Sequence, residues 1–251
     1  KFAKSKESEI YKAWAWGNYN YQSKSKKNLL YVKEQKELEF LTFYSDCINF
    51  SRDLINSPAN KLNPSTYYSK IKNNNLFKSF NFIDYTEKEI NLNFPLTCAV
   101  GKSSSSKPKV IEITNRKLSK KDKPLVIIGK GVTFDTGGVN IKPGTSMRNM
   151  KKDMGGSAIA LSLFLLANYF LKKTKIVLIA PIAENAISSK SMRPGDVYSS
   201  VSGKSVEIAH TDAEGRLLLA DAIEKASSYN PCMIIDFATL TGAARVALGE
   251  D

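Results

Sequence analysis

The chain has 251 residues, 42% hydrophobic and 24% charged, which is the balance of a globular protein with one large domain and a smaller piece. Its single histidine excludes a metal site that needs two imidazoles, and three widely spaced cysteines without a CxxC pair argue for reduced thiols rather than a disulfide framework or a zinc finger. The net charge of +13 leaves a nucleic-acid partner open, although the lysines are scattered along the chain.

The first residues predict a small piece that precedes the main domain. Residues 1–35 are basic and aromatic, and they are too few to build a core, so we expect the tail of a smaller N-terminal α/β domain. Residues 36–57 place apolar side chains at helical spacing, which predicts a connecting helix that stops at Ser57-Pro58. Asn63-Pro64-Ser65 then predicts the start of a second short helix.

From residue 58 to residue 251 the pattern alternates between apolar strands and helices. Strands are predicted at 110–113, 125–128, 176–179, 205–208 and 233–237, and helices at 155–171 and 217–229. This order predicts an α/β fold, a three-layer domain whose mixed central sheet is flanked by helices. The apolar stretch 155–171 is short for a membrane span and contains polar residues, so we expect a buried helix there and no membrane partner.

The chain starts at Lys1 rather than Met and stops at Asp251, directly after an apolar, glycine-containing segment. We therefore expect a piece of a longer protein, a catalytic domain without its C-terminal part.

The strand at 125–128 leads into the glycine-rich segment 129–138, which carries Lys130 and Asp135 and is typical of a loop at a functional site. A second lysine, Lys142, follows. Asp153 stands at the start of the next predicted helix, where it could either cap that helix or serve the site. The local sequence leaves both interpretations open.

A second acidic group follows the strand at 205–208. Asp212 and Glu214 are two residues apart, so on an extended segment their side chains would point the same way. The alternative is an ordinary acidic helix start that complements the helix dipole.

The four carboxylates of Asp135, Asp153, Asp212 and Glu214 all lie in strand-end or helix-start segments. Gathered in one place, they would repel one another unless cations lay between them. Two divalent metals about 3.5–4 Å apart, bridged by shared carboxylates, are the usual arrangement. The residues alone therefore predict a two-metal site with oxygen ligands.

The segment Thr211-Asp212-Ala213-Glu214-Gly215-Arg216-Leu217 resembles the signature of the leucyl (cytosol) aminopeptidase family, which normally has Asn where this chain has His210. Other segments are similar to that family's blocks, in the same order and spacing: 52–60, 129–142, 150–156, 193–197 and 236–243. The resemblance covers the chain from about Trp14 onward, and several long motifs make it specific.

The resemblance implies a metal-dependent aminopeptidase that releases N-terminal amino acids from peptides by attack of a metal-bridging water. It implies two divalent ions, most readily Zn²⁺ or Mn²⁺. Lys130, Asp135, Asp153 and Glu214 would hold one ion, and Asp135, Asp212 and Glu214 the other. Lys142 would polarise the scissile carbonyl, and Arg216 would anchor bicarbonate as the general base.

The resemblance also implies that Met150, Thr239 and Gly242 line the pocket for the first side chain, while the Leu240 carbonyl helps to bind the substrate amine. It implies a cytoplasmic homohexamer. Two alternatives remain: a DNA-binding or non-catalytic scaffold role, which the charge would suit, and another two-metal hydrolase such as a phosphoesterase, whose sites usually recruit histidines.

Overall fold

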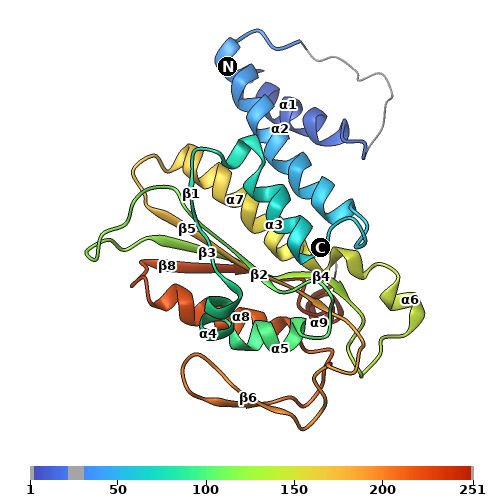
Figure 1. Ribbon diagram of the computed structural model, residues 1–251. Helices are drawn as coiled ribbons and strands as arrows, with labels where there is room; N and C mark the ends of the chain where they lie inside the picture. Colours follow the sequence, from blue (N-terminus) through green and yellow to red (C-terminus); the bar gives the residue numbers. More distant parts are fainter. Residues whose placement is uncertain (1–2, 22–30, 250–251) are drawn as a thin grey trace.

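The computed structural model describes residues 3–21 and 31–249. They form three layers, with a mixed β-sheet in the middle and helices on both of its faces (Figure 1). The sheet follows the order β1-β2-β5-β3-β8, and β4 pairs with the second half of β5. Its strands are β1 (Asn81–Ile83), β2 (Lys109–Thr114), β3 (Leu125–Gly129), β4 (Gly131–Asp135), β5 (Ile176–Asn185) and β8 (Met233–Phe237). The predicted α/β class is thus confirmed.

The strand directions explain why the sheet is mixed. β3, β4 and β8 run parallel to their neighbours, whereas β1 pairs antiparallel with β2, and β2 with β5. The ten-residue β5 lies in the middle and contacts β3 along its first half and β4 along its second half. The carboxyl ends of β4, β5 and β8 consequently point toward the same side of the molecule, where ligands bind in α/β sheets.

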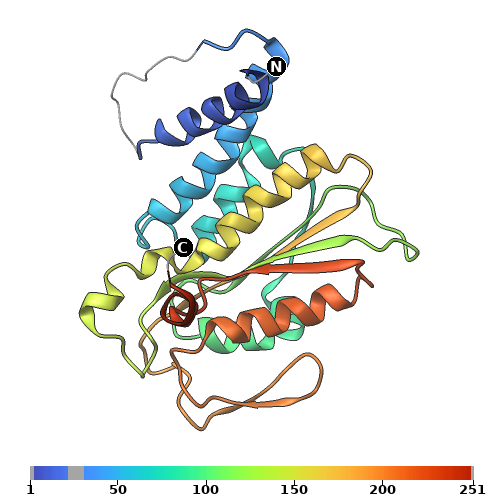
Figure 2. The ribbon, with the colours of Figure 1, turned by 180° about the vertical axis from the view of Figure 1, so that it is seen from behind.

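Helices α2 (Gln35–Asn56), α3 (Pro64–Lys72) and α7 (Gly155–Phe170) cover one face of the sheet, as Figure 2 shows from behind. Their apolar side chains form the largest buried cluster, together with strand residues such as Ile127 and Leu178. The stretch Met150–Phe170 is long and apolar enough to span a membrane, but 67% of its most apolar window is buried inside the protein. The prediction of a buried helix is confirmed.

The other face is covered by α4 (Glu87–Asn93), α5 (Pro95–Gly101) and α8 (Gly215–Ser227). A second cluster of buried side chains, with Val126, Ile179 and Ala222 among its members, joins α8 to the sheet. The remaining short helical segments are α6 (Gly144–Met147), α9 (Ala243–Leu248) and two 3₁₀ turns, η1 (Asn75–Phe77) and η2 (Met150–Met154).

One prediction about the strands was wrong. The glycine-rich segment after residue 128 is not a loop up to residue 138, because residues 131–135 form β4 beside the extended end of β5. The strand predicted at 205–208 is confirmed as β7 (Ser205–Glu207), but in the described part of the chain it pairs with β6 (Val197–Ser199) in a separate two-stranded sheet. The residues that follow it therefore reach the site by a turn and not from the edge of the main sheet.

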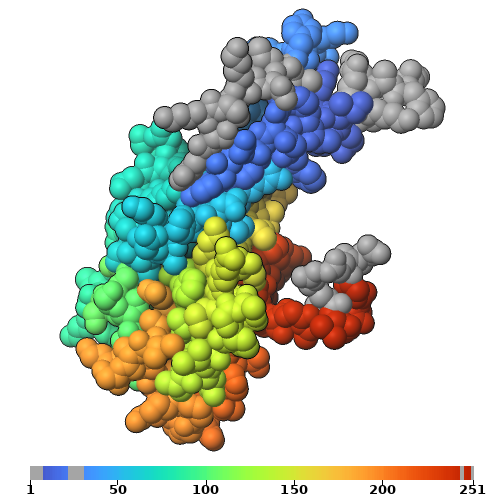
Figure 3. Space-filling model, turned by 90° about the vertical axis from the view of Figure 1, so that its right-hand side faces the viewer, coloured from blue at the N-terminus to red at the C-terminus, as the bar shows by residue number. Residues whose placement is uncertain are grey.

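At the N-terminus, α1 (Ala3–Gly17) lies across α2, and the Arg52 guanidinium donates a hydrogen bond to the Trp16 carbonyl at 2.8 Å. Of the predicted N-terminal piece 1–35, residues 1–2 and 22–30 lie outside the described part. The helix predicted at 36–57 is confirmed as α2, and Asn63 caps α3 as expected. At the other end, α9 projects from the body of the protein (Figure 3), and Val246 is 90% exposed.

Candidate active site

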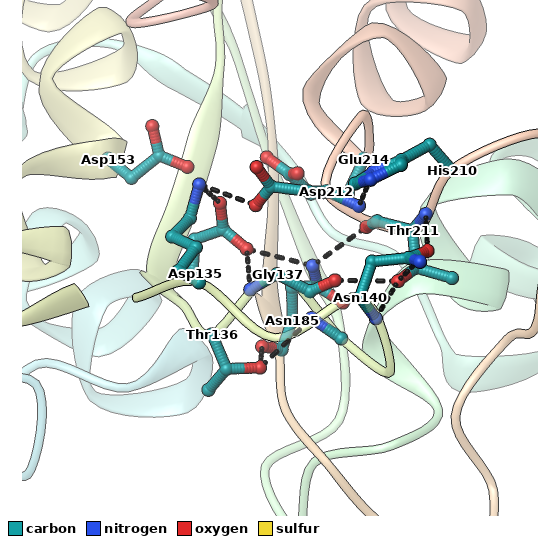
Figure 4. A network of polar contacts seen from close by, with 12 residues as sticks. Asp135, Thr136, Gly137, Asn140, Asp153, Asn185, His210, Thr211, Asp212 and Glu214 are labelled. Carbon is teal, nitrogen blue, oxygen red and sulfur yellow. Dashed lines mark hydrogen bonds and ion pairs between the residues drawn. The ribbon is translucent and has the colours of Figure 1, made fainter. Parts of the chain in front are cut away.

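Three segments that are distant in the sequence meet at the carboxyl end of β4. Lys130 occupies the junction of β3 and β4, and Asp135 is the last residue of β4. Asp153 comes from η2, directly before α7, whereas Asp212 and Glu214 come from the turn that leads into α8. Figure 4 shows the Asp135 and Asp212 carboxylates facing each other, with Asp153 nearby.

The Lys130 side chain is buried between two of the carboxylates. Its backbone N–H donates to the Phe237 carbonyl at 2.9 Å, so β8 fixes the start of the side chain. Its Nζ lies 2.8 Å from Asp153 Oδ2 and 3.1 Å from Glu214 Oε1. Burial alone would lower the pKa of Lys130, but the charges of Glu214 and Asp153 outweigh it and raise that pKa.

Lys142 pairs with the other two carboxylates from the loop that follows β4. Its Nζ lies 2.9 Å from Asp135 Oδ2 and 2.5 Å from Asp212 Oδ1. Although partial burial acts to lower it, hydrogen bonds to Asp212 and Asp135 raise the pKa of Lys142 above its usual value. Each lysine thus holds two of the four carboxylates, and the four acidic residues predicted to converge do so.

Three carboxylates come close enough to share an ion. Asp135, Asp212 and Glu214 each offer one oxygen, and these oxygens lie within 4.8 Å of one another. Burial raises the pKa of Glu214 to about 7 and also raises the pKa of Asp153, because water is excluded from both.

The structure decides between the local alternatives for these acidic residues. No side-chain capping hydrogen bond is made at the start of η2, α7 or α8, so Asp153 and Glu214 do not serve as helix caps. Asp212 and Glu214 do not lie on an extended segment, as the two-residue spacing suggested, because residues 211–212 form a turn and Glu214 has helical dihedral angles. The turn nevertheless brings both side chains to the same cluster.

The predicted substrate-binding residues and Arg216 lie outside this cluster, and Thr239 bonds directly to one of its carboxylates. Thr239 donates a hydrogen bond from its hydroxyl to Asp153 Oδ1 at 2.7 Å, so it contacts a candidate ligand directly. Met150 begins η2, Leu240 is 43% exposed, and Gly242 has open space beside it among the described residues. Arg216 is exposed on the first turn of α8.

His210 lies on the exposed side of the same turn. Its Nδ1 accepts a hydrogen bond from the Asp212 backbone N–H at 3.2 Å. It also lines an open groove with Lys142, Asp212 and the residues that follow β4. The histidine therefore supports the turn from outside the carboxylate cluster.

The polar side chains that hold the cluster in place were not predicted from the sequence. Asn185 is buried at the end of β5, and its Nδ2 donates to Asp135 Oδ1 at 2.8 Å. Thr211 and Asn140 bind each other across two loops. The rule that sites lie beyond strand ends would have identified Asn185, but we expected the strand to stop at Ile179, six residues too early.

The charge of the cluster fits bound cations. Four carboxylates face two lysines, which leaves two negative charges in a largely buried place. Among the described residues, the buried Glu214 Oε2 has no hydrogen-bond partner. A buried carboxylate oxygen without a partner is costly, and a divalent cation would satisfy it. The oxygen donors and an amine suit Zn²⁺, Mn²⁺ or Mg²⁺.

The chain is similar in sequence to proteins of one known family. The sequence profile described as the cytosol aminopeptidase family, catalytic domain, matches residues 49–251. A probable cytosol aminopeptidase of Corynebacterium glutamicum is 44% identical over 206 residues, which cover 81% of this chain and 41% of that protein. The cytosol aminopeptidase of Encephalitozoon cuniculi is 42% identical, over 80% of this chain and 42% of its own length.

Solved structures agree with this comparison. The crystal structure of the cytosol aminopeptidase from Coxiella burnetii superposes with a TM-score of 0.84 at 38% identity, over 97% of this chain and 53% of that chain. The bottromycin maturation enzyme BotP in complex with Mn also gives 0.84, at 30% identity, over 96% of this chain and 54% of that one. The chain thus spans about half the length of the relatives it matches.

Proposed function

The chain belongs to the cytosol aminopeptidase family, and on that premise we propose that the protein is a metal-dependent aminopeptidase that releases N-terminal amino acids from peptides. One observation carries the proposal. Lys130, Asp135, Asp153, Asp212 and Glu214, which resemble the metal ligands of the family, converge in a single cluster in which all but the half-buried Asp212 are buried.

We assign the metal sites as the resemblance implies. Lys130, Asp135, Asp153 and Glu214 would hold one divalent ion, and Asp135, Asp212 and Glu214 the other. When bound, such ions polarise a carbonyl and supply a nucleophilic water at neutral pH. Mn²⁺ and Zn²⁺ are the ions we propose; the similar enzyme BotP has been solved in complex with Mn.

Two cationic side chains have further roles in this proposal. Lys142 reaches the cluster from the loop after β4, where an ammonium can stabilise negative charge on the carbonyl oxygen of the substrate. Arg216 is exposed on the first turn of α8, so its guanidinium and the positive end of the helix suit a small anion. We assign to it bicarbonate, which would act as the general base.

The substrate would bind on the η2 side of the cluster. Asp153 and the Leu240 carbonyl would accept hydrogen bonds from the free amine of the peptide, which makes the enzyme an exopeptidase. Thr239 already contacts Asp153, so it lies where the first residue of the substrate would be. Met150, Thr239 and Gly242 would line the pocket for its side chain.

We also propose the organisation and assembly that the resemblance implies. Residues 1–35 would belong to an N-terminal domain, residues 36–57 would connect it, and residues 58–251 would form the catalytic domain. The full-length protein would act in the cytoplasm as a homohexamer.

The test is hydrolysis of leucine-p-nitroanilide by the protein with Mn²⁺ or Zn²⁺. We expect metal-dependent release of p-nitroaniline, and a loss of about 100-fold or more in Asp212→Asn and in Glu214→Gln. Glu224→Gln makes the same chemical change at an exposed position on α8 and should leave the rate unchanged. If the protein binds metal but hydrolyses neither this substrate nor other aminoacyl anilides, the proposal fails, and a binding role becomes the better interpretation.

A further inference from the structure

Two loops carry the proposed catalytic lysine and two of the candidate metal ligands. The loop at residues 136–142 follows β4 and ends in Lys142, and the turn at residues 210–214 carries Asp212 and Glu214. These loops are about 70 residues apart in the sequence, so the distance between Lys142 and Asp212 depends on whatever joins them. Thr211, whose side chain is completely buried, lies where the two loops touch.

Thr211 binds the other loop through three hydrogen bonds, which involve its hydroxyl and its backbone N–H. Its hydroxyl donates to the Gly137 carbonyl at 2.6 Å and accepts from the Asn140 backbone N–H at 2.9 Å. Its own backbone N–H donates to Asn140 Oδ1 at 2.9 Å. Figure 4 shows Thr211 and Asn140 side by side in this arrangement.

A fourth contact connects Thr211 to the candidate metal ligands. Asn185 Nδ2 donates both to the Thr211 carbonyl at 3.1 Å and to Asp135 Oδ1 at 2.8 Å. The end of β5 thus holds Asp135 and the turn together, and Thr211 adds the loop that carries Lys142.

Two glycines in the loop at residues 136–142 allow its backbone to approach Thr211 closely. Gly137 and Gly138 have φ angles of 84° and 65°, which favour glycine. A Cβ atom at Gly138 would lie 2.8 Å from Thr211 Oγ1. The loop therefore lies directly on the threonine, with no room for a side chain between them.

We propose that Thr211 is a positioning residue, whose hydroxyl holds the Lys142 loop in register with Asp212 and so sets the geometry of metal binding and of catalysis. The assignment rests on the proposed function. Without the hydroxyl, the Gly137 carbonyl and the Asn140 N–H lose their partner at a buried contact, and the loop must shift to satisfy them. Groups that orient metal ligands typically change metal affinity or activity by about 10–100-fold when removed.

The test compares Thr211→Val, which keeps the shape without the hydroxyl, with Thr211→Ser, which keeps the hydroxyl. Mn²⁺ affinity is measured by isothermal titration calorimetry, and kcat and KM with leucine-p-nitroanilide. We expect the valine variant to bind Mn²⁺ about tenfold more weakly and to lose about tenfold in kcat with little change in KM, and the serine variant to retain both. Thr133→Val is the matched control, because Thr133 is equally buried but its hydroxyl donates to Ala183 within the sheet.

The outcomes separate this inference from the proposed function. A folded Thr211→Val protein with wild-type Mn²⁺ affinity and kcat, or a serine variant as impaired as the valine variant, would overturn the role of the hydroxyl. A wild-type protein that neither binds Mn²⁺ nor hydrolyses the substrate would overturn the proposed function and this assignment with it. If Thr211→Val does not fold, Asn140→Ala removes the Oδ1 atom that lies 3.0 Å from the Thr211 hydroxyl and 2.9 Å from its backbone N–H, and it should weaken Mn²⁺ binding and kcat in the same direction; unchanged values would overturn the role of this contact.

Discussion

The Lys130 side chain can reach the carboxylates of Asp153 and Glu214 only because the neighbouring residue, Gly215, has no side chain. A Cβ atom at Gly215, the first residue of α8, would lie 2.4 Å from Lys130 Cε and 2.8 Å from its Nζ. Lys130 is buried and held by two ion pairs, so it cannot move aside without leaving Asp153 or Glu214. Glycine is therefore required at position 215 because a larger residue would collide with the Lys130 side chain, and not because of its backbone dihedral angles.

We predict that Gly215→Ala lowers both Mn²⁺ affinity and the rate of leucine-p-nitroanilide hydrolysis by about 10–100-fold, because a displacement of about 1 Å in a reacting group has an effect of that size. Titration calorimetry and the hydrolysis assay measure the two effects. Gly17→Ala, at a glycine with open space around it, is the control and should change neither. Unchanged Mn²⁺ affinity in the Gly215 variant would mean that Lys130 takes no part in binding the ion.

At the residue scale, the charged members of the cluster could be predicted from the sequence and the residues that orient them could not. Asp212 and Glu214 stand out because closely spaced carboxylates before a helix either bind a cation or complement the helix dipole. Asn185 and Thr211 are common polar residues, and their importance comes from contacts with residues 50 and 74 positions away in the chain. No local pattern reports such contacts.

At the element scale, α5 is held to α8 by a buried carboxylate. Asp221 on α8 accepts hydrogen bonds at its Oδ2 from the Thr97 backbone N–H at 2.7 Å and from the Thr97 hydroxyl at 2.9 Å. Burial raises the pKa of Asp221 to about 6, although the hydrogen bonds from Thr97 act in the opposite direction. The folded protein therefore holds this proton at pH values where the unfolded chain, with a pKa near 3.8, has released it.

The sign of the resulting pH dependence follows from this difference. A raised carboxyl pKa contributes stability that is complete below about pH 4 and is lost as the pH rises through about 6. We predict that the free energy of unfolding of the wild type, relative to Asp221→Asn, falls by about 2–3 kcal/mol from about pH 4 to about pH 7. Urea unfolding of both proteins across this range measures it.

Asp84→Asn provides a comparison of opposite sign. Hydrogen bonds from Lys72 and Tyr68 lower the pKa of Asp84, so its contribution to stability is present at neutral pH and is lost in acid. A stability difference for Asp221→Asn that does not change with pH would show that this carboxyl titrates alike in the folded and unfolded chain.

The elements themselves were predictable where the apolar pattern is local. α7, β3 and β8 begin and end within a residue of their expected positions, because each is a compact apolar run. β4 was missed, since Gly129 and Gly131 are typical of a loop and the strand conformation comes from pairing with β5, about 50 residues away. β6 and β7, in contrast, pair locally as a hairpin, in which Val197 lies opposite Glu207 and Ser199 opposite Ser205.

At the scale of the whole molecule, the candidate ligands come from all three layers of the fold. Asp135 belongs to the sheet, Asp153 precedes the helix on one face, and Glu214 starts the helix on the other face. A cation shared by these residues would tie all three layers together. If the folded protein binds such an ion, as we propose, the ion must also stabilise the fold, because the unfolded chain lacks this arrangement of ligands.

We predict that chelation of the metal lowers the unfolding temperature. An ion at about 100 times its dissociation constant stabilises a protein by about 2.7 kcal/mol, which corresponds to roughly 5–10 °C for a chain of this size. Differential scanning fluorimetry with Mn²⁺ and then with excess EDTA measures the shift. In the double variant Asp212→Asn, Glu214→Gln the shift should be absent.

The unfolding temperatures of the wild type and the double variant can also be compared without metal. Without metal, the wild type holds four carboxylates against two lysines, whereas the double variant holds two carboxylates against two lysines. The variant has lost two ion pairs, yet it has also lost the uncompensated negative charge, so it should unfold at a temperature at or above that of the metal-free wild type. If the variant is instead less stable without metal and responds to EDTA as the wild type does, the ion binds elsewhere and the four carboxylates serve mainly to hold the two lysines.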